Sequence, residues 1–335
     1  MKKILISLAL IILLVTGGLI WWYEGVKPAS NDKIQKDFLI IKGSSATQIA
    51  NKLYKESLIK NPLAFKLYVQ LTNKQGKIQA GEYNITPSFS LFKIVEELIK
   101  GPREVWITIP EGLRREEIAE KFAQVLGSKV PETFIQEFLS ATKKDEGFLF
   151  PDTYLFPKVA SPSAVVKKMR ATFDKKVDSK MQDDILASGH TLNQVITMAS
   201  IVERETRGKE ERAVVAGILY KRLKASWPLQ ADATVQYAIA NVKCLPAQAG
   251  QMSNVKCEWW LPLTIDERDT SSPYDTYRNR GLPPTPIANP GLSSIKAAIY
   301  PEDSLYWFYL HDASGQIHYA KTIEEHNQNI KKYMK

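Results

Sequence analysis

The first hydrophobic feature of the chain is a long apolar segment at its N-terminus. Twenty uncharged residues run from Ile4 to Tyr23, between Lys3 and Glu24. A helix rises ~1.5 Å per residue, so this length spans the ~30 Å hydrocarbon core of a bilayer. A cleaved signal peptide has a shorter apolar core and a small-residue cleavage site, but Trp-Trp-Tyr-Glu stands at that place here. The pattern therefore favours an uncleaved membrane anchor, followed by a short polar linker that ends at residue 30.

Residues 31–102 alternate between short apolar strands and amphipathic helices. Strands are predicted at 38–41 and 81–85. Capping residues mark three helix starts, at Ser45, Asn61 and Ser90. The order strand, helix, helix, strand is that of a LysM-like glycan-binding module.

From Arg103 onward, longer helices dominate the pattern. We expect a strand at 105–109, a hairpin from 304–311 and 316–320, and helices over 115–126, 131–141, 163–176, 191–206, 210–224 and 322–333. The aromatic run at 146–156 is predicted to be a loop, used either for core or lid packing or as a sugar-stacking wall. The predicted class is α+β, with an anchor over 1–30, a LysM-like module over 31–102 and a helix-rich mixed domain over 103–335.

Composition narrows the class of protein and its location. With 44% hydrophobic and 24% charged residues, the chain is not a largely disordered one, and its 335 residues suit two domains and an anchor. Two Cys and four scattered His exclude a Cys-based zinc finger and argue against a multi-His metal centre. Lys2 and Lys3 favour a cytoplasmic N-terminus, which places the rest of the chain outside the cytoplasmic membrane.

The net charge of +9 is concentrated in the small module. Residues 31–102 hold eleven Lys, no Arg and six acidic residues, which gives +5. This charge is either the solvated surface of a spacer domain or an attraction for an anionic polymer. Nucleic acid is disfavoured as a partner, because the chain lies outside the cytoplasm and carries none of the usual nucleic-acid-binding motifs.

Cys244 and Cys257 lie thirteen positions apart in a segment rich in turn residues. An exported compartment permits a disulfide between them, and a loop of this size would stabilise the fold by roughly 3 kcal/mol. The alternative is two free thiols. The location of the chain favours the bridge.

Two carboxylates stand near the end of the helix predicted over 191–206. Burial and the negative end of a helix both disfavour a charged carboxylate, so Glu203 or Glu205 is expected to have a raised pKa, as a general acid near neutral pH requires. At 100° per residue Glu203 lies in the apolar stripe, and Glu205 lies about 160° from it. Periodicity therefore makes Glu203 the more buried residue. The residues alone leave either Glu as a candidate acid or as a solvated surface residue.

Several motifs in fixed order make the chain similar to one family. Thr197-Met-Ala-Ser-Ile-Val-Glu-Arg-Glu-Thr206 resembles the signature of the MltG (YceG-like) family, the endolytic murein transglycosylases. Further similar stretches begin at Glu146, Leu229, Tyr274, Gly281 and His326, so the resemblance covers nearly the whole chain. The chain departs from the family pattern at Arg204, where Lys is usual, at Ala233, where Pro is usual, and around 244–257, which looks like an insertion.

The resemblance implies a catalytic residue and a reaction. The family's catalytic glutamate corresponds to Glu205, with Glu203 as a supporting residue. Glu205 would protonate the bridging oxygen of the β-1,4 bond from N-acetylmuramic acid to N-acetylglucosamine. It would then take the proton of the C6 hydroxyl to leave a 1,6-anhydro end, with no metal or diffusible cofactor. The expected substrate-positioning residues are Gln230, Asp232, Thr234, Tyr274 and Tyr277.

Two other functions stay open on the sequence. Asp232 as a second catalytic carboxylate would make the protein a hydrolytic muramidase. Structural rather than catalytic glutamates would make it a membrane-anchored wall-binding protein that recruits synthases. For the enzyme, the resemblance implies peptidoglycan strands and peptidoglycan synthases (penicillin-binding proteins) as partners. It also implies a bacterial inner-membrane location with the catalytic domain in the periplasm, and a role in wall assembly and strand termination.

Overall fold

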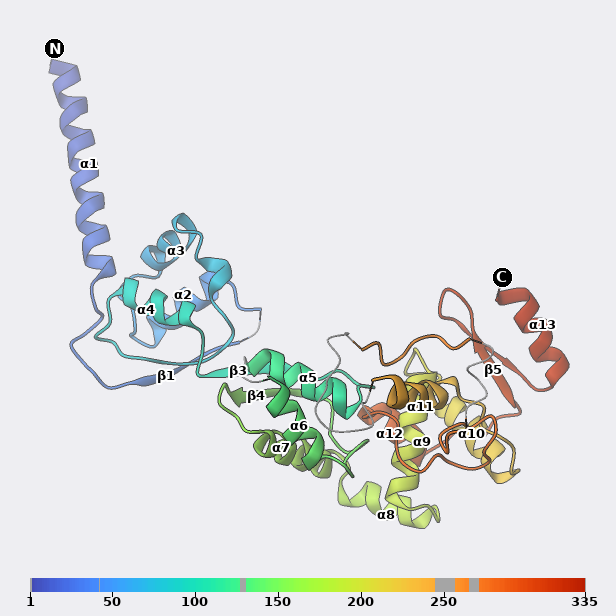
Figure 1. Cartoon of the computed structure of the whole chain (residues 1–335). Helices are drawn as coiled ribbons and strands as arrows, with labels where there is room; N and C mark the ends of the chain where they lie inside the picture. Colours follow the sequence, from blue (N-terminus) through green and yellow to red (C-terminus); the bar gives the residue numbers. More distant parts are fainter. Residues whose placement is uncertain (1, 42, 127–130, 245–256, 265–270, 335) are drawn as a thin grey trace. The chain divides into compact units, whose positions relative to one another are not determined.

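The computed structural model describes residues 2–41, 43–126, 131–244, 257–264 and 271–334. Within them it has thirteen α-helices, one short 3-10 helix and two small sheets, which confirms the predicted α+β class. The chain forms two compact units, whose elements are labelled in Figure 1. Unit 1 combines residues 1–107 with 154–160, and unit 2 combines residues 108–153 with 161–335.

Unit 1 begins with the apolar helix α1 (Lys2–Val26). Its segment Ser7–Val26 has a mean hydropathy of 1.7 and is only 11% buried. Among the described residues it is the one helix whose length and composition suit a membrane span. The last turn of α1 is different, because Val26 is buried in the same apolar cluster as Phe38 and Phe65. Packing therefore fixes the end of the predicted anchor to the module.

A four-stranded sheet organises the rest of unit 1, in the order β1 (Lys36–Ile40), β2 (Gly81–Ile85), β3 (Glu104–Thr108) and β4 (Thr153–Pro157). β1 and β2 pair antiparallel, with Phe38 opposite Tyr83. Between them lie α2 (Ala46–Lys55), α3 (Pro62–Leu71) and the 3-10 helix η1 (Gln75–Lys77), and α4 (Leu91–Lys100) follows β2. The side chains of Ser45, Asn61 and Ser90 cap these α-helices as predicted. The expected strand, helix, helix, strand order is thus confirmed.

The sheet also takes in two segments that the sequence placed in the larger part of the chain. β3 begins at Glu104, and β4 lies in the aromatic run that we expected to be a loop. In β4 the rings of Tyr154 and Phe156 are buried, whereas Thr153 and Pro157 are exposed. A five-residue strand that ends in proline carries little local signal, so its pairing with a distant strand decides its structure.

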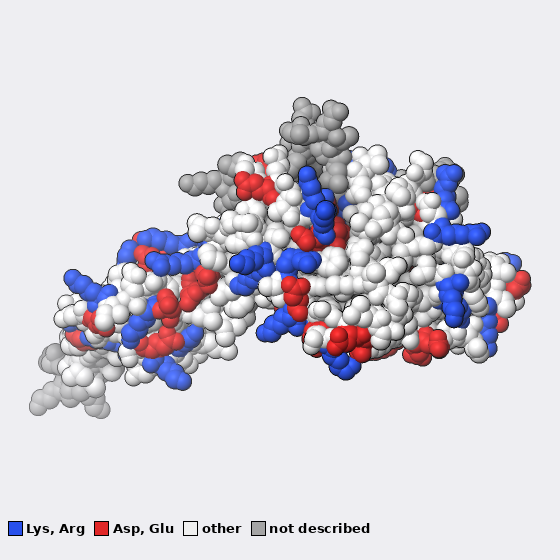
Figure 2. Space-filling model, turned by 90° about the horizontal axis from the view of Figure 1, so that it is seen from below, with Lys and Arg blue, Asp and Glu red and all other residues white. Residues whose placement is uncertain are grey.

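Many lysines of unit 1 have acidic partners. In α4, Lys93 and Lys100 each form ion pairs with both Glu96 and Glu97, at 2.8–3.2 Å. On the face shown in Figure 2, Lys and Arg side chains are interspersed with Asp and Glu side chains. This distribution favours the solvated-surface interpretation for part of the module's positive charge, and such exposed pairs contribute little to stability.

Unit 2 is predominantly helical. Its helices are α5 (Arg115–Leu126), α6 (Pro131–Ala141), α7 (Pro162–Lys176), α8 (Ser179–Ala187), α9 (Leu192–Glu205), α10 (Arg212–Lys224), α11 (Asp232–Cys244), α12 (Leu292–Ile299) and α13 (Ile323–Tyr333). The predicted hairpin is present as β5 (Phe308–His311) and β6 (Ile317–Ala320). The sequence analysis did not predict α8, α11 or α12. Two of these are only nine and eight residues long, and α11 has a weak apolar periodicity.

Helix α9 is the centre of unit 2. Thr191 forms a capping box with Gln194 at its start, and every residue from Val195 to Val202 is buried. Helices α8, α10, α11 and α12 all contact it. Neighbouring elements cover α9 on all sides through this stretch. Its C-terminal end, which lies beyond the stretch, carries Glu203 and Glu205.

The structure joins Cys244, the last residue of α11, to Cys257 in a disulfide, with the two Cα atoms 5.8 Å apart. The rest of the loop that this bond closes, residues 245–256, lies outside the described residues.

We expect the native protein to contain no free thiol. Mass spectrometry of the non-reduced, alkylated protein measures this directly, and two alkylated cysteines in the native protein would contradict the expectation. Replacing both residues, as Cys244→Ser with Cys257→Ser, should lower the free energy of unfolding by roughly 3 kcal/mol, because the unfolded chain regains the entropy of an open loop.

Candidate active site

Glu205, the last residue of α9, holds a carboxyl group in an unusual environment. The hydroxyl of Tyr309 on β5 donates a hydrogen bond to its Oε2 atom at 3.1 Å. Protein atoms surround the carboxyl group closely although the residue keeps some exposed surface, and this desolvation raises its pKa to about 7. The nearby charge of Asp232 raises the pKa further, whereas Tyr309, the Ala233 N–H and Arg222 lower it. The result is a carboxylic acid that gains and loses its proton near neutral pH.

Asp232, the first residue of α11, is the second carboxylate of this site. The hydroxyl of Tyr277 donates a hydrogen bond to its Oδ1 atom at 2.5 Å. A carboxylate in the first turn of a helix is favoured by the partial positive charge of the helix N-terminus. Glu205 and Asp232 therefore have different surroundings, and the raised pKa of Glu205 suits that residue for proton transfer.

Arg222 on α10 connects the elements around Glu205. Its buried guanidinium donates to the carbonyl of Trp307 at 2.6 and 3.0 Å, just before β5, and to the carbonyl of Leu229 at 2.7 Å, just before α11. Its positive charge acts on the pKa values of both Glu205 and Tyr309. One side chain thus positions the two segments that supply Tyr309 and Asp232.

The segment before α11 has an unusual backbone. Gln230 has φ +53°, a left-handed conformation rare for a residue with a side chain, and its side chain is exposed. Its N–H donates to the carbonyl of Thr276 at 3.1 Å. The Thr234 hydroxyl, expected from the sequence to position substrate, is instead fully buried and bonded to Ala231 and Thr276 at 2.8 and 2.9 Å. Thr234 fixes this segment, whereas the side chain of Gln230 is exposed and that of Asp232 is partly buried.

The side chain of Glu203 forms its contacts outside the group of residues around Glu205. Its side chain is only 6% exposed and accepts from Arg212 of α10 at 2.8 Å. Its other oxygen accepts from the N–H of Gly291 at 2.9 Å, and Gly291 is the N-cap residue of α12. Glu203 therefore ties α9 to α10 and α12, and its contacts are those of a structural residue.

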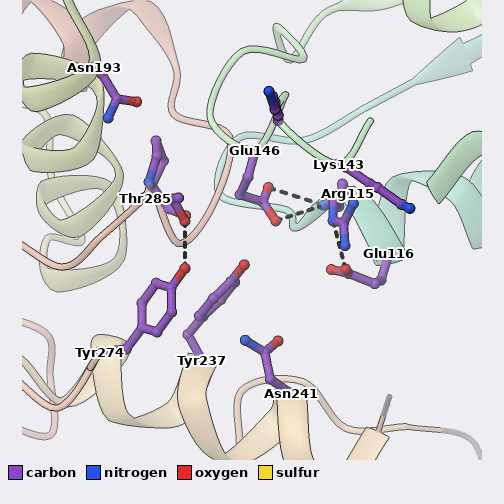
Figure 3. A pocket seen from close by; sticks show the side chains of 11 residues that line it. Arg115, Glu116, Lys143, Glu146, Asn193, Tyr237, Asn241, Tyr274 and Thr285 are labelled. Carbon is purple, nitrogen blue, oxygen red and sulfur yellow. Dashed lines mark hydrogen bonds and ion pairs between the residues drawn. The ribbon is translucent and has the colours of Figure 1, made fainter. Parts of the chain in front are cut away.

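Tyr274 and Tyr277, proposed together as sugar contacts, lie in different places. Tyr277 contacts Asp232, whereas the Tyr274 hydroxyl bonds with Thr285 at 2.7 Å and its ring packs 4.9 Å from that of Tyr237. Asp275 between them is buried and accepts the backbone N–H of Tyr277 at 2.9 Å. This turn separates the two rings, and Tyr274 instead lines a neighbouring cavity, shown in Figure 3.

Tyr309 and Arg222 are the site residues that sequence reasoning missed. The alternating pattern predicted the strand that carries Tyr309, but a partly buried tyrosine on a strand is ordinary. A basic residue in the last turn of a helix is equally ordinary, because it interacts favourably with the helix dipole. The sequence around Tyr309 and Arg222 therefore contains no signal that marks either residue as part of the site.

Comparisons with known proteins agree on one family. The model of the YceG-like family matches residues 38–332. A protein of Bacillus subtilis named endolytic murein transglycosylase is 31% identical over 348 residues, which cover 96% of this chain and 91% of that protein. A protein of Streptococcus pneumoniae with the same name is 29% identical, and the chain spans 65% of its length. A crystal structure of a yceG-like protein from Listeria monocytogenes, 28% identical, covers 88% of this chain and 99% of its own, with a TM-score of 0.56.

Replacing Tyr309 with Phe should raise the pKa of Glu205 above its value of about 7, because the lost hydrogen bond stabilises the ionised carboxylate. Carbon-13 NMR titration of labelled glutamate carboxyl groups measures this pKa without requiring any activity. Tyr306→Phe is a control, since it removes a neighbouring tyrosine hydroxyl not bonded to Glu205. An unchanged or lower midpoint in Tyr309→Phe would show that this hydroxyl does not act on the carboxylate.

Proposed function

The chain belongs to the YceG-like family and is a lyase of the endolytic murein transglycosylase type, and on this premise we propose how it acts. Its substrate is the β-1,4 bond from N-acetylmuramic acid to N-acetylglucosamine within peptidoglycan strands, and its product carries a 1,6-anhydro end. The observation that supports this proposal most strongly is the Glu205 carboxyl group. Its pKa of about 7 lets one residue act first as acid and then as base.

Glu205 starts the reaction in its protonated form. It donates the proton to the bridging oxygen as the bond from that oxygen to C1 breaks, which leaves an oxocarbenium-like centre on the muramyl sugar. The ionised Glu205 then takes the proton of the C6 hydroxyl while the oxygen bonds to C1. Glu205 ends the cycle protonated, so no water or second nucleophile is consumed.

Tyr309 and Arg222 support the ionised stage of this cycle. Burial raises the pKa of Tyr309 well above its usual value, so its hydroxyl keeps its proton and remains a donor to Glu205. The Arg222 charge also favours the carboxylate. Both interactions strengthen when Glu205 loses its proton, which is when charge develops in the site.

A hydrolytic muramidase is the alternative that one observation favours. Asp232 lies near enough to influence the pKa of Glu205, and a second carboxylate is what a hydrolase uses to activate water or to form a covalent intermediate. The relatives named transglycosylase favour the lytic route. The two routes differ in their products, which are 1,6-anhydro ends or reducing ends.

We propose that α1 anchors the enzyme in the bacterial inner membrane, with its N-terminus in the cytoplasm and the residues that follow α1 outside. The length and composition of α1 support an anchor, and Lys2 and Lys3 support this orientation. The LysM-like order of unit 1 supports contact with glycan. In this position the enzyme would terminate strands made by peptidoglycan synthases of the penicillin-binding type.

Glu205→Gln should nearly abolish release of 1,6-anhydro products, because the amide keeps the shape of the side chain but has no transferable proton. Loss of acid–base assistance typically costs ~10²–10⁴-fold in rate. Products from purified strands are identified by mass spectrometry, with thermal melting in parallel to show that the variant is folded.

Glu203→Gln is the matched comparison, two residues away on the same helix. It should lower stability first, on the order of 1–3 kcal/mol, because it leaves Arg212 and the Gly291 N–H mispaired. A folded, inactive Glu203→Gln beside an active Glu205→Gln would reverse the assignment. No release of products by the folded wild-type protein would favour the non-catalytic wall-binding protein, and reducing ends from wild type would favour the hydrolase.

The anchor is expected to remain on the mature protein. N-terminal sequencing of membrane-extracted protein should find residues ahead of Tyr23, because the segment lacks a small-residue cleavage site. A mature chain that starts after residue 23 would identify the segment as a signal peptide instead.

A further inference from the structure

A cavity of about 270 Å³ opens beside α11, away from the Glu205 carboxyl group. Figure 3 shows its labelled side chains, which come from α5, from the segment before β4, from the first turn of α9, from α11 and from the segment before α12. Glu146 and Tyr237 point toward its centre, and the Tyr274 ring closes one side. The proposed reaction at Glu205 uses none of these groups except, as a candidate contact, Tyr274.

Positive charge dominates this cavity. Glu116 is already neutralised, because it accepts from Arg114 at 3.1 Å and from Arg115 at 2.9 Å. Lys143 and Lys144 are exposed at the rim, and no ion pair joins either of them to another described residue. An anionic group entering the cavity therefore meets two available ammonium groups.

The deeper side chains offer hydrogen-bond donors. Oε1 of Glu146 accepts from Asn289 at 2.8 Å, and the Arg115 N–H is shared between Oε1 at 3.2 Å and Oε2 at 3.4 Å. Burial, with the charge of Glu116, raises the pKa of Glu146 to about 8, so near neutral pH this carboxyl group carries a proton that it can donate. The carbonyl oxygen of Asn241 accepts from Arg114, which leaves its amide N–H groups for a ligand.

The Tyr237 hydroxyl is a further donor. In Figure 3 it points between Glu146 and Arg115, and it has no hydrogen-bond partner among the described residues. Burial raises its pKa above the usual value, so it stays protonated. The inner part of the cavity thus presents several donors and two aromatic faces, with cations at the rim. This arrangement suits a carboxylate-bearing group about the size of one amino-acid residue.

We infer that this cavity binds a carboxylate carried by the peptidoglycan strand next to the bond that Glu205 cleaves. The inference rests on the proposed function, since that function supplies the strand. Helix α11 contributes residues both to the site around Glu205 and to the cavity. α11 carries Asp232 at its first residue and Tyr237 and Asn241 ~8 and ~14 Å further along its axis. A strand seated at Glu205 therefore brings its neighbouring substituents within reach of the cavity.

A peptidoglycan strand has two sources of such a carboxylate. One is the free lactyl carboxylate of a muramyl sugar without peptide, and the other is a carboxylate of the stem peptide. Three soluble probes separate them: N-acetylmuramic acid, N-acetylmuramyl-L-alanyl-D-glutamate, and the diamide of the latter, which has no carboxylate. Calorimetry on the full chain in detergent, carrying Glu205→Gln, measures binding independently of cleavage.

At least one of the two carboxylate probes should bind several-fold more tightly than the diamide, and whichever binds better identifies the source. The double variant Lys143→Glu with Lys144→Glu should lower that affinity roughly fivefold or more, the upper scale of an exposed ion pair. Lys175→Glu is the matched control, because Lys175 is an exposed lysine on α7 that does not line the cavity. It should bind as the parent protein does.

Equal or undetectable binding of all three probes overturns the inference. The inference is also overturned if the double variant at Lys143 and Lys144 still prefers the carboxylate probes as the parent protein does. Digestion of purified strands, carried out in parallel, distinguishes a failure of this inference from a failure of the proposed function. A wild-type chain that releases anhydro ends but shows no carboxylate preference contradicts the cavity assignment alone. A chain that prefers carboxylate but releases no anhydro ends contradicts the proposed reaction alone.

Discussion

The burial of α9 on all sides is the constraint on which unit 2 depends. From Val195 to Val202 no side chain of this helix faces solvent, so every neighbouring helix is placed by packing against it. The charged side chains of α9 are confined to its C-terminal end, where backbone carbonyls are unpaired and the helix dipole is negative. The C-terminal end is therefore an environment in which a carboxylate is unfavourable unless something compensates for it. Two glutamates stand there, and the protein compensates for them in different ways.

The two glutamates differ in the groups that compensate for their burial, and this difference gives them different chemical roles. Glu203 has a full ion pair with Arg212 and a backbone donor from Gly291, so its charge is satisfied and joins three helices. Such a buried pair contributes little net stability, yet losing one partner is costly. Glu205 has only the Tyr309 hydroxyl at 3.1 Å, the Ala233 N–H and the charge of Arg222 to oppose its desolvation. Its proton therefore stays available near neutral pH. Two residues along the helix are enough to turn a structural carboxylate into a proton donor.

The same principle recurs at Glu146. It is buried, accepts hydrogen bonds from Asn289 and from the Arg115 N–H, and lies near the charge of Glu116, so its pKa is also raised. Here the guanidinium groups of Arg114 and Arg115 are engaged with Glu116 and with backbone carbonyls, and neither forms an ion pair with Glu146. Unit 2 thus holds two carboxylic acids whose pKa values are raised to about 7 and about 8. One is placed to transfer a proton, and the other to donate a hydrogen bond to an anion.

Local signals predicted the helices that carry their own caps, such as those after Ser45, Asn61 and Thr191, because a cap acts within one turn of its helix. They also placed the apolar N-terminal helix and the C-terminal hairpin. The strand β4 and the short helix α12 depend on long-range packing, and α12 has no side-chain cap, whereas the nine-residue helix α8 carries a cap at Asp178 that the sequence analysis did not use. For the site, the family resemblance singled out Glu205, whereas periodicity pointed to Glu203 as the more buried. Only the folded chain brings Tyr309 and Arg222 to Glu205 and separates Tyr274 from Tyr277, because the energy of a buried carboxyl group depends on neighbours that are distant in sequence.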